Sequence, residues 1–222
     1  MRTLYHHPLS SPSRKVRLVL SEKDLSFTAV VEKPWDRRTE FLALSPGGEV
    51  PVLVEEDGFA IPDANAILEY IEETRPNPPL LSTGPTARAK VRALAGFFDR
   101  VFFRDVVETL VVEKALKRLQ GSGEPDGFAI RRGYQALEEH LKYINYLAEQ
   151  HKGLASDALT LADLTAAAHL SVVDYLGDIA WDKHPEARAW YSRMKSRPSF
   201  RPLLADHIPG LPPPVHYANL DF

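Results

Sequence analysis

The chain has 222 residues, of which 44% are hydrophobic and 26% are charged, and its formal net charge is -3. This composition is typical of a soluble globular protein of one or two domains with a sizeable core. The slight negative charge argues against nucleic acid as the main partner, because a nucleic-acid-binding protein is expected to carry a basic face. Since the chain has no cysteine, disulfides, thiolate zinc sites and cysteine nucleophiles are excluded.

The first third of the chain alternates short strand patterns with short helical patterns. Strands are expected at residues 2–5 and 27–32 and in a hairpin at 50–62 that turns at Asp57-Gly58, and helices are expected at 13–23, 38–45 and 63–74. The proline-rich run 75–85 then breaks any helix and indicates a linker. We therefore predict a small α/β domain over residues 1–76.

Beyond this linker the strand patterns disappear. Helices are expected at residues 86–120, between Ile130 and Ala148, at 160–176 and at 185–197. We predict an all-helical domain over residues 86–205 and an extended proline-rich tail over 206–222. The fold class is therefore α/β plus all-α, with the α/β part first.

The sequence also limits where the protein works and what it binds. The N-terminus lacks the apolar run of a signal peptide, and no stretch approaches the roughly 18 apolar residues of a membrane-spanning helix. We expect a cytoplasmic protein that does not insert into a membrane. The eight histidines never show a His-x-x-x-His spacing on a helix, so we expect no metal site.

The stretch Ser10-Ser11-Pro12-Ser13 lies where the first strand gives way to the first helix. Free N–H groups and partial positive charge at a helix N-terminus favour an anion, so a serine hydroxyl there could hold a thiolate ionised. An ordinary helix start explains the same residues, with Ser11 as N-cap and Pro12 at the first helical position. The residues alone leave both interpretations open.

A proline opens one of the predicted strands, at Val50-Pro51. Proline is excluded from the middle of a central strand, so Pro51 must lie at the start or at an edge. A cis Val50–Pro51 bond would expose the Val50 backbone to a ligand, which could pair with it as an added strand does.

The motif Thr160-Leu161-Ala162-Asp163 has the spacing of a capping box before an apolar helix. We therefore expect Thr160 and Asp163 to start that helix and to have no catalytic role.

Two segments carry aromatic residues that could contact a partner. Trp35 lies among charged residues in a predicted connection, where it either packs on the sheet or stands out as a binding anchor. The tail ends with Tyr217, Leu220 and Phe222, which are costly to expose to water. We interpret the tail as a docking segment.

Taken together, Ser10-x-Pro12, Val50-Pro51, "PDANAILEYI" and Thr160-x-x-Asp163 resemble the glutathione transferase superfamily. The resemblance implies a thioredoxin-like N-terminal domain followed by an all-α C-terminal domain. It also implies that Ser10 would activate the glutathione thiol in a catalytic relative, and that Val50 would pair with the backbone of the glutathione cysteine.

The chain departs from this superfamily at Asp63-Ala64, where relatives usually carry Glu-Ser or Asp-Ser. In relatives that serine holds the γ-glutamyl carboxylate, and losing one such hydrogen bond costs roughly 1.5–3 kcal/mol. Glutathione affinity would fall about tenfold to hundredfold, although the Ala64 N–H could still serve. We therefore expect no cofactor and, at most, weak glutathione binding.

A narrower resemblance joins "YHHPLSSPSRKVRL", "EKPWDRR", "LSVVDYLGDIAWDKHP" and the tail to the FtsZ-binding, transferase-like division proteins of alphaproteobacteria. It implies a homodimer that binds and curves FtsZ filaments at the division site and does not conjugate glutathione. It also implies a partner-binding surface that includes Trp35 and the end of the tail, here Asn219, Asp221 and Phe222. Asn219 replaces an aspartate of that subfamily, which keeps the shape and removes a charge.

Three hypotheses follow for the function. Ala64, Trp35 and the tail favour a scaffold that binds FtsZ filaments. Ser10 and Val50-Pro51 favour a catalytic glutathione transferase or a dehalogenase-like enzyme. An unrelated adaptor on the same fold is the third hypothesis, because a fold does not fix a function.

Overall fold

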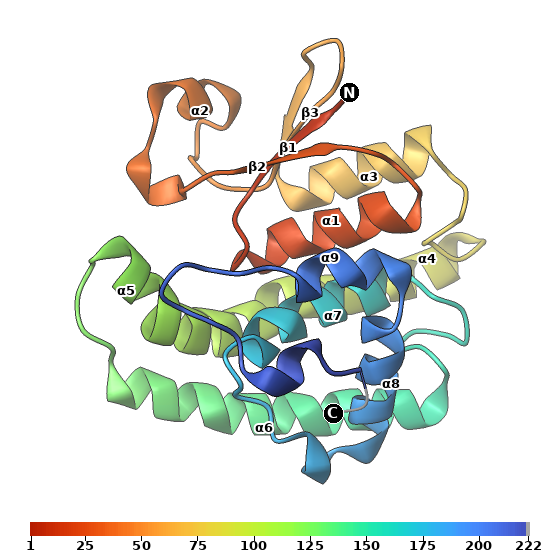
Figure 1. The fold of residues 1–222 in the computed structure, drawn as a ribbon. Coiled ribbons are helices and arrows are strands. Elements are labelled where there is room, and N and C mark those ends of the chain that lie inside the picture. Colours follow the sequence, from red (N-terminus) through yellow and green to blue (C-terminus); the bar gives the residue numbers. More distant parts are fainter. Residues whose placement is uncertain (221–222) are drawn as a thin grey trace.

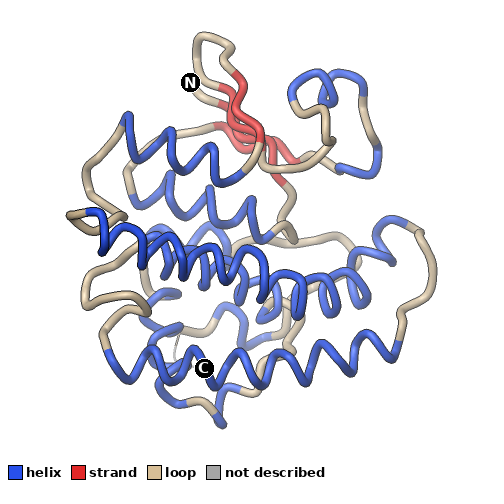
Figure 2. The backbone as a smooth tube through the Cα atoms, turned by 180° about the vertical axis from the view of Figure 1, so that it is seen from behind, coloured by secondary structure: helices blue, strands red, loops and turns tan. Residues whose placement is uncertain are grey.

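The computed structural model describes residues 1–220, in which a small sheet and its helices lie over a larger layer of helices (Figures 1 and 2). Within these residues the sheet has four strands, β1 (Thr3–His6), β2 (Thr28–Val31), β3 (Val52–Val54) and β4 (Ala60–Pro62). Their spatial order is β2-β1-β3-β4; β1 and β2 are parallel, and β3 is antiparallel to both of its neighbours. The sheet is therefore mixed, and the predicted strands and hairpin are confirmed.

Helices α1 (Ser11–Glu22) and α3 (Ala64–Thr74) lie on one side of the sheet (Figure 1). The turn η1 (Pro34–Asp36) and the short helix α2 (Thr39–Leu44) lie in the connection from β2 to β3. Helix α1 is buried along nearly its whole length, because it is held between the sheet and the helical layer. It therefore buries its cations Arg14, Lys15 and Arg17 as well as its apolar residues.

The rest of the chain is helical, as predicted. Helix α4 (Pro85–Phe97), η2 (Phe98–Leu116), whose turns are of the wide π type, and α5 (Lys117–Gln120) follow one another directly, which matches the helix expected at 86–120. The remaining elements are α6 (Gly127–Gln150), α7 (Leu161–Asp174), η3 (Trp181–Lys183), α8 (Pro185–Lys195), η4 (Pro198–Phe200), α9 (Arg201–Leu204) and η5 (Val215–Ala218). Every residue of α7 is buried, because α1, α4, η2 and α8 all pack around it.

The N-terminus of α1 corrects one detail of the sequence interpretation. Ser10, not Ser11, is the N-cap, with an extended backbone and an Oγ that accepts a hydrogen bond from the Ser13 N–H at 3.2 Å. Pro12 consequently occupies the second helical position. Because two adjacent serines have the same capping preference, the choice between them depends on where the strand ends.

The other two predicted local motifs are present. The Val50–Pro51 peptide bond is cis. At the start of α7, the Asp163 carboxylate accepts hydrogen bonds from the Thr160 N–H at 2.9 Å and from the Thr160 hydroxyl at 2.7 Å.

The C-terminal segment folds back over the helical layer (Figure 1). Tyr217 is completely buried against the chain itself, so the interpretation of its ring as part of a partner-docking tail is wrong. Leu220 stays partly exposed, whereas Asp221 and Phe222 lie outside the described residues. Among residues 1–220, no helix is both long and apolar enough to span a membrane.

Candidate functional site

A cavity of about 600 Å³ opens between the sheet and the helical layer. The β1–α1 turn, the η1 connection and η2 form its walls. Its apolar lining includes Leu9, Trp35, Phe103, Val107, Val112 and Leu116. Its polar lining includes His7, Ser10, Arg37, Glu49 and Gln120. Such a mostly apolar concave site with a few polar groups is typical of binding sites in proteins.

Ser10 lies in this cavity at the N-terminus of α1. Its N–H donates to the His7 carbonyl at 2.9 Å, which fixes the turn, and its Oγ accepts from the Ser13 N–H. The hydroxyl proton of Ser10 is not used in either bond, so it can be donated to an anion. The geometry thus permits both roles considered for Ser10, a helix cap and a donor to a bound group.

Trp35 and His7 form one side of the cavity. Trp35 is half-buried, and its ring meets the His7 ring edge-on at 5.1 Å between centroids. Burial, followed by the nearby charge of Arg14, lowers the pKa of His7 to about 4, so its ring is neutral at pH 7. Trp35 is therefore neither a core residue nor fully exposed; its ring lines the cavity beside the neutral His7 ring.

A second cavity of about 350 Å³ adjoins the first, and it brings together Val50, Pro51, Asp63 and Ala64. Asp63 has a positive φ of 75°, and its carboxylate accepts hydrogen bonds from the Asn65 and Ala66 N–H groups at 2.8 and 2.9 Å. The chain's own carboxylate therefore already caps the N-terminus of α3, which is where an anionic ligand would otherwise bind.

The charges of this smaller cavity are predominantly negative. Its lining includes the carboxylates of Glu49, Asp63 and Asp99 and one cation, Lys15. The Lys15 ammonium is committed to Asp99, at 2.7 and 2.8 Å from the two carboxylate oxygens, and to the Asn65 side chain at 2.9 Å. A ligand with two carboxylates would meet repulsion here and no free cation.

Asp99 lines both cavities. Burial alone would raise the pKa of its carboxyl, but the hydrogen bond to His169 and the charge of Lys15 outweigh burial and lower that pKa. The Nε2 atom of His169 lies 3.1 Å from Asp99 Oδ1. Burial lowers the pKa of the His169 ring. Asp99 is thus a fixed negative charge that joins α1, η2 and α7.

The predicted site residues fall into separate places. Ser10, Trp35 and Val50 meet in the larger cavity, while Val50, Pro51, Asp63 and Ala64 meet in the smaller one. Asn219 is exposed and lies in the lining of neither cavity, and Asp221 and Phe222 are outside the described residues. Among residues 1–220, no group of three or more histidine or carboxylate side chains is placed to hold a metal ion.

Sequence reasoning missed His7, Asp99 and the wall contributed by η2. The four-residue spacing of Phe103 and Val107 marks one helix face, but nothing local shows that this face borders a cavity. The pairing of Lys15 with Asp99 spans 84 positions, so it depends on how the helices pack.

Residues 4–79 match the family model of the glutathione S-transferase N-terminal domain, and residues 129–198 match that of the C-terminal domain. The chain is 48% identical to FtsZ-localized protein A of Caulobacter vibrioides, and the alignment covers 100% of this chain and 98% of that protein.

Two solved structures resemble the whole chain. A crystal structure described as a glutathione S-transferase from Rhodospirillum rubrum F11 is 54% identical, with a TM-score of 0.98 and complete coverage of both chains. The structure of FzlA from C. crescentus is 48% identical, with a TM-score of 0.97, and the match covers 100% of this chain and 99% of that one.

Proposed function

Because the chain belongs to the glutathione S-transferase family, we propose that it is a non-catalytic scaffold of that fold that binds FtsZ filaments and regulates bacterial cell division. One observation carries this proposal, namely the 48% identity over full length to a protein named for its localisation with FtsZ. We further propose that the protein works in the cytoplasm, at the division site, and binds neither nucleic acid nor membrane.

The smaller cavity supports the absence of glutathione conjugation. Ala64 provides no hydroxyl for a ligand carboxylate, and Asp63 itself caps the N-terminus of α3. Glu49, Asp63 and Asp99 add negative charge that a free cation does not balance. Glutathione carries two carboxylates and one ammonium group, so its net charge is negative, and we propose that this protein uses no glutathione cofactor.

Trp35 is the residue that we propose to carry most of the filament contact. A half-buried tryptophan that lines an apolar cavity offers a large, rigid surface, and such residues contribute a large share of interface energy. Asn219, Asp221 and Phe222 are proposed as a second contact. Tyr217 is not part of this contact, because its side chain is buried in the chain's own core.

We also propose that the protein is a homodimer. Phe59, Tyr143 and Tyr146 expose 57%, 38% and 57% of their surface, so they are available for a contact with a second copy. Closed twofold symmetry is the commonest arrangement of such assemblies. Light scattering should give about twice the 24.9 kDa mass of the chain, and a monomer at tens of micromolar would contradict this proposal.

Co-sedimentation with polymerised FtsZ tests the central proposal. The unchanged protein should pellet with the filaments, and Trp35→Ala or deletion of residues 219–222 should abolish pelleting with nearly unchanged melting temperature. Ser10→Ala is the matched control in the same cavity, and it should pellet normally. Loss of binding in the Ser10 variant, or normal binding in the Trp35 and tail variants, would overturn the assignment of the surface; failure of the unchanged protein to pellet would overturn the function itself.

A catalytic glutathione transferase that uses Ser10 is the alternative function. Two observations favour it: the Ser10 hydroxyl lies in an open cavity at a helix N-terminus, and a structure with 54% identity is described as a glutathione S-transferase. Calorimetric titration with glutathione and a conjugation assay with a chloro-dinitro aromatic decide between the two. We expect affinity weaker than millimolar and negligible turnover, whereas micromolar affinity would favour the enzyme.

A further inference from the structure

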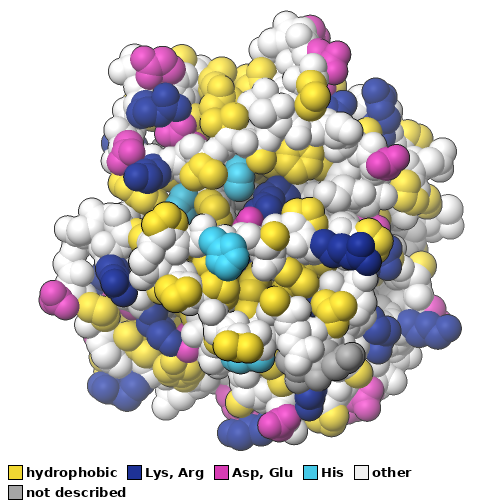
Figure 3. Space-filling view, in the orientation of Figure 1, with side chains coloured by type: hydrophobic (Ala, Val, Ile, Leu, Met, Phe, Trp, Pro, Cys, Tyr) yellow, Lys and Arg dark blue, Asp and Glu magenta, His cyan; other side chains and the backbone are white. Residues whose placement is uncertain are grey.

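A small basic surface lies where α5 is followed by the start of α6. Residues 113–132 contain five lysine or arginine residues and three acidic ones, although the whole chain has a net charge of -3. Figure 3 shows Lys and Arg side chains over this part of the molecule, at the left of the view. Four exposed side chains, which we call the arginine surface, belong to Arg118, Phe128, Arg131 and Arg132.

Phe128 is the apolar residue of the arginine surface. It is 62% exposed in the first turn of α6, a helix whose other side packs on η2. The guanidinium groups of Arg131 and Arg132 lie 6.0 and 5.6 Å from its ring centroid, as expected for residues three and four positions further along a helix. The helix therefore presents an aromatic ring beside two guanidinium groups, at distances that permit cation–π attraction.

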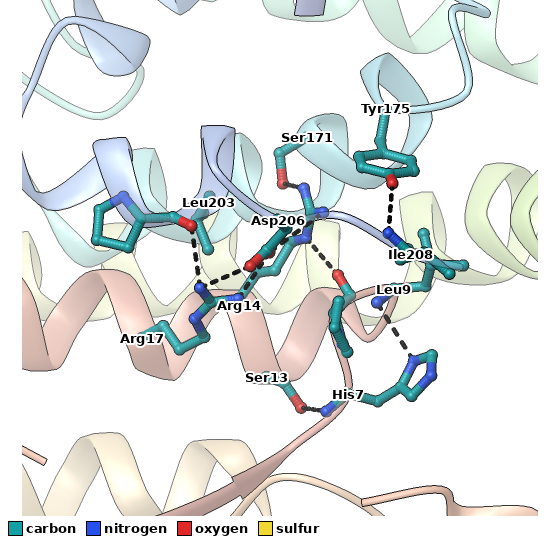
Figure 4. A network of polar contacts seen from close by, with 12 residues as sticks. His7, Leu9, Ser13, Arg14, Arg17, Ser171, Tyr175, Leu203, Asp206 and Ile208 are labelled. Carbon is teal, nitrogen blue, oxygen red and sulfur yellow. Dashed lines mark hydrogen bonds and ion pairs between the residues drawn. The ribbon is translucent and has the colours of Figure 1, made fainter. Parts of the chain in front are cut away.

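The three arginines of this surface have no carboxylate partner in the chain. Within residues 1–220 no ion pair involves any of them, and no residue three or four positions away from any of them is acidic. The buried arginines differ, because Figure 4 shows Arg14 and Arg17 around the carboxylate of Asp206. Neither helix pairing nor packing explains the exposed arginines, so they are available to an acceptor from outside the chain.

The acidic residues of the same segment leave this surface positive. Glu113 pairs with Lys117 at 2.6 Å, and Asp126 caps α6 by accepting the Phe128 N–H at 2.8 Å. The third acidic residue of the segment is Glu124. One carboxylate cannot neutralise three guanidinium groups, so an acidic partner would meet net attraction here.

The arginine surface continues into the larger cavity. Arg118 lies on α5 between Leu116 and Gln120, and both of these residues line that cavity together with Trp35. In both backbone views, α2, α5 and the start of α6 lie along the same edge of the molecule (Figures 1 and 2). A partner that contacts Trp35 therefore has the arginine surface beside it.

We propose that the arginine surface binds an acidic segment of the filament subunit, with carboxylates on the arginines and an apolar side chain on Phe128. This inference rests on the proposed function, because it names the chemistry that the filament presents next to Trp35. A guanidinium group can donate two parallel hydrogen bonds to one carboxylate, and arginine and aromatic residues are enriched in protein interfaces. The net negative charge of the chain and the small extent of the surface disfavour nucleic acid.

Co-sedimentation with polymerised FtsZ at several salt concentrations tests this surface. Arg131→Glu combined with Arg132→Glu should weaken filament binding at low salt by at least about tenfold, because repulsion replaces attraction. Added salt should weaken binding of the unchanged protein more than that of this variant. Phe128→Ala should weaken binding severalfold at every salt concentration, because the apolar contact is lost.

Arg88→Glu is the matched control. Arg88 is also an exposed arginine without an ion pair in the described chain, and it lies in the first turn of α4, away from α5 (Figure 1). The control should pellet normally, and all variants should keep the melting temperature and the mass by light scattering, because the changed side chains are exposed. If the double reversal lowers the melting temperature, Arg131→Ala with Arg132→Ala decides by the same criteria.

The possible failures are distinguishable. Normal pelleting of the Arg131 and Arg132 variants, or an equal loss in Arg88→Glu, would overturn the arginine surface and leave the proposed function standing. Failure of the unchanged protein to pellet would overturn both. Flotation with phosphatidylglycerol vesicles that depends on the same arginines would assign the surface to a membrane and overturn the acidic protein segment as its occupant.

Discussion

Replacing Asp206 by asparagine should strongly destabilise the protein, because this carboxylate joins the two layers. Asp206 accepts hydrogen bonds from Arg17 at 2.7 and 2.9 Å and lies 3.6 Å from Arg14 Nη2. The side chains of Arg14 and Arg17 are 0% and 9% exposed, and that of Asp206 is 11% exposed. Asp206→Asn keeps the shape but leaves two buried guanidinium groups without an opposing charge.

The magnitude follows from the burial of these charges. Removing one member of a buried ion pair typically costs about 3–5 kcal/mol, because the other charge stays buried and uncompensated. For a chain of this length, each kcal/mol lowers the melting temperature by about 2–4 °C. Thermal unfolding followed by circular dichroism should therefore show a melting temperature lower by roughly 6–20 °C.

Two further variants decide whether burial is the cause. Glu139→Gln breaks the exposed pair with Lys142, which water screens, so it should leave the melting temperature nearly unchanged. Adding Arg17→Met to Asp206→Asn removes one unpaired buried charge, so it should restore part of the lost stability. The reasoning is refuted if Asp206→Asn melts within a degree or two of Glu139→Gln, or if the double variant is the sum of its parts.

Three other outcomes are expected. Burial lowers the pKa values of His6 and His7 to about 4, and the nearby charges of Arg17 and Arg14, respectively, are the next largest cause. Because the ordinary histidine pKa is 6.5, the unfolded state binds more protons than the folded state below that pH. Stability should fall as the pH drops from 6.5 to 4, by about 2 kcal/mol per histidine at pH 5, with a shallower slope for His7→Gln in urea unfolding. Asp163→Ala should cost about 3–5 kcal/mol in the same assay, because it leaves the buried donors of Leu154 and Trp190 unpaired, and a loss below 1 kcal/mol would contradict this. Ala64→Ser should tighten glutathione binding about tenfold by calorimetry, and no gain would show that a missing hydroxyl is not the cause of weak binding.

The fold could be predicted because its signals are local. The change from strand alternation to helical periodicity near residues 75–85 and the hairpin at Asp57-Gly58 each appear within a dozen residues. The one-residue error at Ser11 has an equally local cause, because Ser10 and Ser11 are interchangeable in capping preference.

The tail could not be predicted, because the burial of Tyr217 depends on groups far away in the sequence. Its hydroxyl accepts from Arg14, 203 positions earlier, and donates to the Leu203 carbonyl at 3.1 Å. An aromatic residue in a proline-rich tail gives no local sign that its side chain is buried against such distant groups. The three cations Arg14, Lys15 and Arg17 lie beside the apolar run of the same helix, and cations that become buried require distant acceptors.

The two cavities differ in a way that bears on the choice between scaffold and enzyme. In the smaller cavity the charged groups already bind one another: Lys15 is paired with Asp99, and Asp63 caps the start of α3. The apolar one stays open beside Trp35. Under our proposal, the smaller cavity would have to accept glutathione for conjugation, whereas the filament contact that we propose involves Trp35 in the larger cavity.

The position of Ser10 on helix α1 allows the scaffold and the enzyme to be distinguished with one variant. Its N-cap Ser10 lines the cavity, while Arg14 bonds to Ser171 of α7 and Arg17 bonds to Asp206, so these two arginines hold the two layers together. Because Ser10 contributes one capping bond and no contact across the layers, Ser10→Ala removes the chemistry of the hydroxyl at a cost of about 1 kcal/mol. Filament binding and glutathione binding can therefore be compared in a variant that keeps Trp35 and the contacts between the two layers. A scaffold should retain filament binding after this change, and an enzyme should lose turnover.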